Sequence, residues 1–281
     1  MSNAFDKETK YKLFRSIREI INPAISKKNV SDYKIIFDEE CLPLRVFYPK
    51  KIIDISKIII FIHGNDTVTE CTSKYAEICK KLALKTNHSV FAIDYKDLKG
   101  NYKEMYQGIY DTIKYLYKEL ERNGIDINNI TLAGDSTGCN IVTGINYLNK
   151  KEIPIKQEIL FYPVLSLEYS TKSYESMNRN EDYNIGLVER LDKYYHTIVN
   201  DEDINDKLLR PLQVEDNNNP STLILTGNVD SLKDEAREYY EKIGDKDNKY
   251  VELPFCSHGF LRRIDKDLEK DLFGVLNDFL K

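Results

Sequence analysis

Residues 130–140 read ITLAGDSTGCN and contain the pattern G-x-S-x-G, with its serine at Ser136. The apolar run at 130–133 predicts a strand, and the residues after the pattern are compatible with a helix. A serine on a tight turn from strand to helix points outward, and the flanking glycines permit the close backbone approach that the turn requires. The pattern therefore predicts a nucleophile at Ser136, with a glycine-rich phosphate loop or a plain turn as the alternatives.

Short apolar runs alternate with longer helical patterns along the rest of the chain. The predicted strands are residues 57–62, 89–93, 130–133, 158–162, 222–225 and 250–253, and the predicted helices are residues 102–121, 232–243 and 266–280. This alternation is typical of βαβ units and a mostly parallel sheet. The strand runs are nearly continuous in Ile, Leu, Val and Phe, which indicates that helices cover both faces. The predicted fold class is α/β.

The chain has 281 residues, which is near the upper limit for one hydrophobic core, and no linker-like segment divides it. We therefore expect a single domain over residues 1–281. Two stretches do not fit the alternation, because residues 1–30 look helical and residues 166–205 follow a strand without delivering another. Both are predicted as elements of a small helical cap over a site, although packing also explains the tyrosines of the second stretch.

The composition argues against several kinds of partner. The net charge of −5 comes from intermixed acidic and basic residues, so nucleic acid is not expected. No apolar run approaches the ~18 to 20 residues that cross a bilayer, and the N-terminus lacks the apolar stretch of a secretion signal. Five cysteines without a CxxC pair argue against disulfides and a zinc site and favour the cytoplasm. The sequence is compatible with a homodimer.

A serine nucleophile needs a base to take its proton, and that base needs an acid to orient it. Of the four histidines, His88 precedes a predicted strand, His196 lies in the predicted cap, and His63 begins a second candidate motif. His258 follows the last predicted strand, in a loop that faces the carboxyl ends of the strands. Elimination and position together predict His258 as the base, with a solvated loop histidine as the alternative.

The predicted acid is Asp230, which follows the strand at 222–225 in a loop at the same edge of the sheet. The order Ser136, Asp230, His258 is one in which serine hydrolases carry their nucleophile, acid and base. Asp234 is a rival four residues later. We favour Asp230, because Asp234 falls on the helix predicted from residue 232 and is expected to face away from the histidine.

A tetrahedral intermediate also needs backbone N–H donors for its negative charge, and the loss of one donor costs ~3 kcal/mol of barrier. Thr137, directly after the nucleophile, is expected to supply one. The segment His63-Gly64-Asn65-Asp66 follows the strand at 57–62, and Gly64 and Asn65 are expected to supply others. The alternative is a simple turn after the strand.

Taken together, these motifs resemble those of the hormone-sensitive-lipase-like family of esterases and acetyl esterases, from about residue 55 to the end. Residues 134–140 read GDSTGCN where that family has G-D-S-A-G-G-N, residues 230–235 match D-x-L-x-D-E, and residues 258–260 match H-G-F. Residues 94–95 and 162–163 are similar to its D-Y and Y-P segments. The resemblance implies an α/β-hydrolase fold with a helical cap built from the N-terminus and from the segment after Y-P.

The sequence departs from the family pattern at the expected oxyanion loop. The family has H-G-G-G where residues 63–66 read HGND, and the segment after residue 95 lacks the family's A-P-E. A non-glycine residue has fewer backbone conformations, although asparagine visits left-handed geometry more readily than most residues. Reduced activity or an altered substrate range is therefore a possible consequence of Asn65.

The residues and the resemblance together lead to a serine carboxylesterase that hydrolyses small, short-acyl esters through an acyl-enzyme. It needs no metal and no organic cofactor. The preference for small esters rests mainly on the family resemblance. Two alternatives stay open: an amidase or peptidase that uses the same three residues, and a ligand-binding protein of the same fold without useful catalysis.

Overall fold

The computed structural model describes residues 33–35, 41–50, 54, 56–65, 72–95, 100–125, 127, 130–177, 186–200, 203–214 and 220–281. The predicted cap segment 1–30 lies outside these residues, as do parts of the second predicted cap segment. Cys71 also falls outside, and the four cysteines within the described residues are free thiols.

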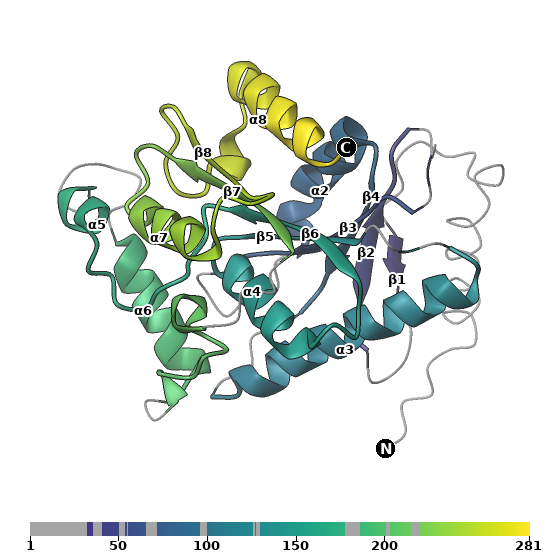
Figure 1. The fold of residues 1–281 in the computed structure, drawn as a ribbon, viewed down its shortest axis with the longest axis horizontal. Helices are drawn as coiled ribbons and strands as arrows, with labels where there is room; N and C mark the ends of the chain where they lie inside the picture. Colours follow the sequence, from purple (N-terminus) through teal and green to yellow (C-terminus); the bar gives the residue numbers. More distant parts are fainter. Residues whose placement is uncertain are drawn as a thin grey trace.

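The described strands form one eight-stranded sheet in the order β1-β2-β4-β3-β5-β6-β7-β8 (Figure 1). The strands are β1 Tyr33–Ile35, β2 Leu44–Phe47, β3 Ile58–Ile62, β4 Ser89–Ile93, β5 Ile130–Asp135, β6 Ile155–Phe161, β7 Ser221–Gly227 and β8 Lys249–Leu253. The pairs β1·β2 and β2·β4 are antiparallel, and the other five pairs are parallel. The predicted mostly parallel sheet is confirmed.

Helices cover both faces of the sheet. They are α2 Thr72–Thr86, α3 Tyr102–Arg122, α4 Thr137–Asn149, α5 Lys172–Met177, α6 Leu187–Ile198, α7 Lys233–Ile243 and α8 Lys266–Phe279, with 3-10 turns η2 Pro211–Gln213 and η3 Phe260–Arg263. One hydrophobic cluster joins α3, α4 and α7 to the sheet, and a second joins α2 and α8 to it from the other side (Figure 1). All residues of β3 and β4 are buried, which is why these strands read as continuous apolar runs.

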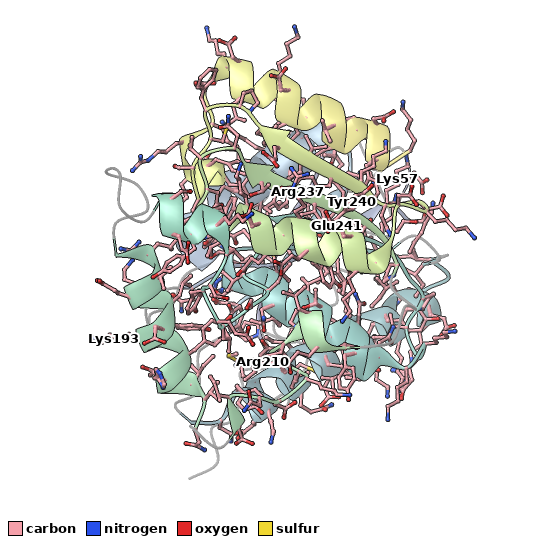
Figure 2. The ribbon with its side chains drawn as sticks, turned by 60° about the vertical axis from the view of Figure 1, so that its left-hand side comes forward. Lys57, Lys193, Arg210, Arg237, Tyr240 and Glu241 are labelled. Atoms are coloured by element: carbon pink, nitrogen blue, oxygen red, sulfur yellow. The ribbon has the colours of Figure 1, made fainter. Side chains whose placement is uncertain are left out.

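Helices α5 and α6 occupy the stretch 166–205 between β6 and β7. Helix α6 is amphipathic: Leu191, Tyr194 and Tyr195 are buried, whereas Lys193 lies on its outer side (Figure 2). The buried tyrosines therefore serve packing, as an amphipathic helix requires. No helix in the described part of the chain is long and apolar enough to cross a membrane.

Several boundaries differ from the sequence predictions. Strand β6 begins at Ile155 rather than at residue 158. Its first three residues are not fully buried, and two of them, Lys156 and Gln157, are polar, which interrupts the apolar run. Strands β1 and β2 and helix α2 were not predicted. Strand β4 has the predicted bounds, and α3 extends one residue beyond its predicted end.

Candidate active site

Ser136 lies on the sharp turn between β5 and α4. Its φ and ψ are 52° and −123°, a backbone conformation that a non-glycine residue rarely adopts. Two glycines allow the surrounding segments to approach. A Cβ on Gly138 would lie 2.2 Å from the Ile62 carbonyl oxygen, and a Cβ on Gly64 would lie 2.5 Å from the Asp135 carbonyl oxygen. The start of α4 and the loop after β3 are therefore packed directly against each other.

His258 reaches Ser136 from the loop after β8. Its Nε2 lies 2.9 Å from Ser136 Oγ, and its side chain is 8% exposed. The ring of Tyr162 packs edge-on against the imidazole, with 5.0 Å between ring centroids. This packing restricts the ring to an orientation in which Nε2 faces the hydroxyl.

Asp230 lies on the far side of the imidazole, in the loop after β7. Its Oδ2 and Oδ1 are 3.0 and 3.2 Å from His258 Nδ1, and the residue is fully buried. Oδ1 also accepts the Leu232 N–H at 2.9 Å. The Val229 N–H donates to the Cys256 carbonyl oxygen at 3.1 Å, which fastens the β7 loop to the β8 loop. The structure thus brings Ser136, His258 and Asp230 together in one chain of contacts.

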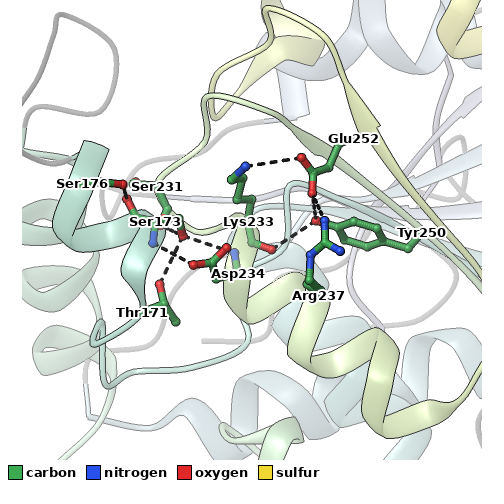
Figure 3. A network of polar contacts seen from close by, with 9 residues as sticks. All are labelled: Thr171, Ser173, Ser176, Ser231, Lys233, Asp234, Arg237, Tyr250 and Glu252. Carbon is green, nitrogen blue, oxygen red and sulfur yellow. Dashed lines mark hydrogen bonds and ion pairs between the residues drawn. The ribbon is translucent and has the colours of Figure 1, made fainter.

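Asp234, the rival acid, lies in the first turn of α7 and serves a different contact. Its Oδ2 accepts the Ser173 N–H at 2.7 Å, and Ser173 Oγ donates to the Ser231 carbonyl oxygen at 2.8 Å (Figure 3). These bonds tie α5 to α7. The structure does not place Asp234 with His258.

The other histidines make no contact with Ser136 among the described residues. His63 is buried between the rings of Tyr75 and Tyr95, and burial lowers its pKa to about 4, so the ring is neutral near pH 7. His88 is buried just before β4, and His196 on α6 lies 3.6 Å from Asp192.

The three predicted oxyanion residues lie together, but two of their N–H groups already have acceptors. The Gly64 N–H donates to Asp135 Oδ1 at 2.7 Å, and the Asn65 N–H donates to Thr137 Oγ1 at 2.7 Å. The Thr137 N–H belongs to the first residue of α4, where helix geometry provides no partner, and none occurs among the described residues. Asp66 lies outside the described residues.

Asp135 organises a buried network that the sequence did not indicate. Its Oδ2 accepts the hydroxyls of Tyr75 and Tyr162, each at 3.0 Å, and Arg262 donates to the Tyr75 hydroxyl oxygen at 2.8 Å. Burial raises the pKa of Asp135, while the Gly64 N–H and the Arg262 guanidinium oppose that rise. The position of Asp135 inside the G-x-S-x-G pattern was the signal available for it, whereas nothing in the sequence linked Arg262 to it.

A cavity of about 670 Å³ opens beside Ser136 and His258. Leu187 and Arg190 of α6 line it, so the second predicted cap segment contributes to its wall. Phe255 also lines it and is 93% exposed. Within the described residues, no group of His, Cys, Asp or Glu side chains is arranged to hold a metal ion.

Comparison with known proteins adds the following. A family model described by the alpha/beta hydrolase fold matches residues 59–262. A protein of Acanthamoeba polyphaga mimivirus named as an alpha/beta hydrolase is 22% identical over 82% of this chain and 67% of its own length. The arylacetamide deacetylase of Oryctolagus cuniculus is 26% identical over 62% of this chain and 45% of its own length. The chain thus spans less than half of the deacetylase.

Among solved structures, carboxyl esterase 2 of the fungus Tuber melanosporum superposes with a TM-score of 0.78. The superposition covers 91% of this chain and 88% of the esterase, at 17% sequence identity. At that level of identity the likeness speaks for the fold alone. It agrees with the parallel sheet and flanking helices described above.

Proposed function

This chain belongs to the α/β-hydrolase family, in its hormone-sensitive-lipase-like and acetyl esterase branch, and on that premise we propose that it is a serine carboxylesterase acting on small, short-acyl esters. The observation that supports this most directly is the 2.9 Å contact between Ser136 Oγ and His258 Nε2, with Asp230 behind the imidazole. A hydroxyl becomes a useful nucleophile when a base held in this way takes its proton.

The contacts define a direction for proton transfer. With Nδ1–H donating to Asp230, Nε2 is left unprotonated and accepts the Ser136 proton. The Ser136 oxygen then attacks the ester carbonyl carbon, and the imidazolium that forms is stabilised by the Asp230 carboxylate. His258 returns the proton to the departing alcohol, which leaves an acyl group on Ser136.

Water completes the cycle by the same route. His258 removes a proton from a water molecule, the hydroxide attacks the acyl carbon, and the proton returns to Ser136 Oγ as the carboxylic acid leaves. In both steps the negative charge on the carbonyl oxygen needs N–H donors. The Thr137 N–H supports the proposal of an oxyanion site, because it has no partner among the described residues.

The size and lining of the cavity favour a small substrate. Its volume of about 670 Å³ is in the range of sites for small molecules, and α6 narrows it with Leu187 and Arg190. Polar and charged side chains share the lining with apolar ones, which suits a soluble ester better than a long acyl chain.

The test is hydrolysis of p-nitrophenyl esters from acetate to decanoate by the wild type and by Ser136→Ala. We expect saturable turnover that is highest on the short chains and is lost in the variant. Ser257→Ala is the matched control, because Ser257 lines the same cavity beside His258 but has no role in the proposed chemistry. Turnover that survives Ser136→Ala, or is absent from every ester, would contradict the proposal.

An aryl amide is the second candidate substrate, because one of the relatives is named as an arylacetamide deacetylase. The same three side chains serve amide cleavage, since a histidine held in this way can also give its proton to a departing amine. Hydrolysis of p-nitroacetanilide beside p-nitrophenyl acetate distinguishes the two. A higher kcat/KM on the anilide would assign the protein to amides.

A cytoplasmic location and a homodimer stay predictions. Cell fractionation with an antibody to the protein tests the first, and light scattering of the purified protein tests the second.

A further inference from the structure

The loop that carries the predicted oxyanion donors is held by bonds that do not involve Thr137. The Tyr95 hydroxyl donates to the His63 carbonyl oxygen at 2.6 Å, and the Tyr75 hydroxyl lies 3.1 Å from the Gly64 carbonyl oxygen. The Gly64 N–H is fixed by Asp135 Oδ1 at 2.7 Å. The bonds from the Tyr95 hydroxyl and from the Gly64 N–H, with the His63 ring stacked between two tyrosines, fix the loop as far as Gly64.

The Thr137 side chain adds a reciprocal pair of hydrogen bonds to the next residue of this loop. Thr137 Oγ1 accepts the Asn65 N–H at 2.7 Å and donates to the Asn65 carbonyl oxygen at 2.9 Å. Thr137 is 1% and Asn65 is 5% exposed, so bulk water competes little for either group. The hydroxyl thus uses its proton and one lone pair on a single partner residue.

Asn65 also lies beside the reacting centre. Asn65 and Ser136 line the same cavity, and a Cβ on the preceding residue, Gly64, would lie only 2.9 Å from Ser136 Cβ. The Thr137 backbone N–H follows Ser136 directly in the chain. One residue therefore offers a backbone donor to the site, while its side chain occupies a second donor beside it.

We propose that the Thr137 hydroxyl is an internal competitor for the oxyanion site: it occupies the Asn65 N–H in the resting protein, and the carbonyl oxygen of the substrate must displace it as negative charge develops. The inference rests on the proposed ester hydrolysis. It says that the Thr137 hydroxyl lowers kcat by cancelling part of the stabilisation of the oxyanion. No covalent bond is made or broken at Thr137. The Asn65 N–H changes its acceptor from Thr137 Oγ1 to the carbonyl oxygen of the substrate.

The competition has a measurable consequence. A donor occupied by a neutral hydroxyl in the ground state is available to the oxyanion only after that bond is lost, so part of its stabilisation is cancelled. Removing the hydroxyl should raise kcat about fivefold, a factor that corresponds to one ordinary hydrogen bond. KM should change little, because the uncharged ester carbonyl gains less from the freed donor than the oxyanion does.

The experiment compares Thr137→Ala and Thr137→Val with Thr137→Ser and the wild type on p-nitrophenyl acetate. We expect both hydroxyl-free variants to raise kcat, and the serine variant, which restores a hydroxyl, to lose the gain. An alkyl boronic acid, which forms a tetrahedral adduct with a nucleophilic serine, should bind the two hydroxyl-free variants more tightly by a similar factor. Thr143→Ala, in the same helix with its hydroxyl bonded to the Asn140 carbonyl oxygen, is the control for helix effects.

The outcomes separate this inference from the proposed function. Turnover that depends on Ser136 but falls, or does not change, in Thr137→Ala overturns the competition and leaves the esterase proposal standing. A fall in kcat together with a lower Tm in both hydroxyl-free variants would identify the hydroxyl as a loop support instead. If neither the wild type nor Thr137→Ala turns over any ester or amide, the proposed function fails, and the competition fails with it.

Discussion

The two sides of Ser136 are built in different ways. On the base side, the β7 and β8 loops leave His258 Nε2 facing the hydroxyl and Asp230 facing Nδ1. On the oxyanion side, the N–H groups of Gly64 and Asn65 are turned onto side chains of the protein itself. Both sides lie at the carboxyl ends of the parallel strands of one sheet, so the sheet does not account for the difference.

The hydrogen bonds around each side of Ser136 account for the difference. On the base side, backbone groups join the loops to each other, for example the Val229 N–H and the Cys256 carbonyl oxygen. Asp230 also accepts the Leu232 N–H, and its carboxylate still reaches His258 Nδ1 while Nε2 faces Ser136. On the oxyanion side, the side chains of Asp135 and Thr137, which flank Ser136, bind the N–H groups that an oxyanion would use. Under the proposed mechanism, the nucleophile and base are therefore in contact while two of the predicted oxyanion donors are occupied.

The largest effect is expected on the base side. Asp230→Asn should lower kcat about 10⁴-fold, because an amide fixes the wrong imidazole tautomer and leaves an imidazolium without its counter-charge. Steady-state kinetics on p-nitrophenyl acetate measure the loss. A fall of less than tenfold would remove Asp230 from the proposed role and reopen the assignment of the acid.

On the oxyanion side, Asp135→Asn should lower kcat by about 10², less than the base-side change, because weaker bonds to Gly64 and the tyrosines let the loop at Gly64 and Asn65 move away from Ser136 while the base stays in place. An amide offers one oxygen acceptor, so it cannot serve both the Gly64 N–H and the hydroxyls of Tyr75 and Tyr162. The pair of kcat values compares the two sides directly. Since Asp135 is fully buried, the Tm is recorded alongside, and an unchanged kcat contradicts the role given to this network.

A smaller effect is expected where α5, in the second predicted cap segment, is attached to α7. Asp234→Asn keeps one acceptor but removes the charge that binds the Ser173 N–H, so α5 should be held less firmly. We expect KM to rise about threefold with kcat within a factor of two. Steady-state kinetics of Asp234→Asn and Asp230→Asn over the same range of substrate concentrations show whether the first changes mainly KM and the second mainly kcat. A loss of kcat as large as that in Asp230→Asn would contradict this division.

Glu158, a buried acid in β6, belongs to neither side and should affect stability alone. Burial raises its pKa to about 8, and its support is a 3.3 Å bond from the Thr222 hydroxyl. Because the pKa of Glu158 is raised in the folded state, its contribution to the free energy of unfolding is fully present below about pH 4.5 and is lost as the pH rises toward 8.

Glu158→Gln cannot ionise, so the variant should gain stability over the wild type as the pH rises. The gain should be on the order of 4 kcal/mol at pH 8.5 and close to zero at pH 4.5. Urea unfolding at both pH values measures it, with kcat expected to stay within twofold. A gain that does not depend on pH would show that ionisation of Glu158 is not its cause.

The sequence predicted most of the central sheet, because strands buried on both faces must be apolar throughout. It failed where that rule weakens: β6 begins with partly exposed residues, and β2 is a four-residue strand that contains Arg45. Helix α2 is a different case. Its buried residues Tyr75, Ile78, Cys79 and Leu82 have helical spacing, so the signal was present and was missed.

What the sequence by itself determined is the grouping of Ser136, Asp230 and His258. Each follows a predicted strand, and parallel strands deliver their carboxyl ends to one edge, so local patterns were enough to bring the three residues together. Their chemical roles stay proposals until the variants are measured.

Only the tertiary structure decided which partners the N–H groups and buried hydroxyls take. Arg262 is hydrogen-bonded to Tyr75, which lies 187 positions away in the sequence, and Thr137 is hydrogen-bonded to Asn65, which lies 72 positions away. Hydrogen-bond partners depend on distances of a few tenths of an ångström between segments that the fold docks together, and no local pattern encodes such distances. The sequence therefore named the residues of the oxyanion side, and the packing of α4 against the β3 loop decided that two of their donors are occupied.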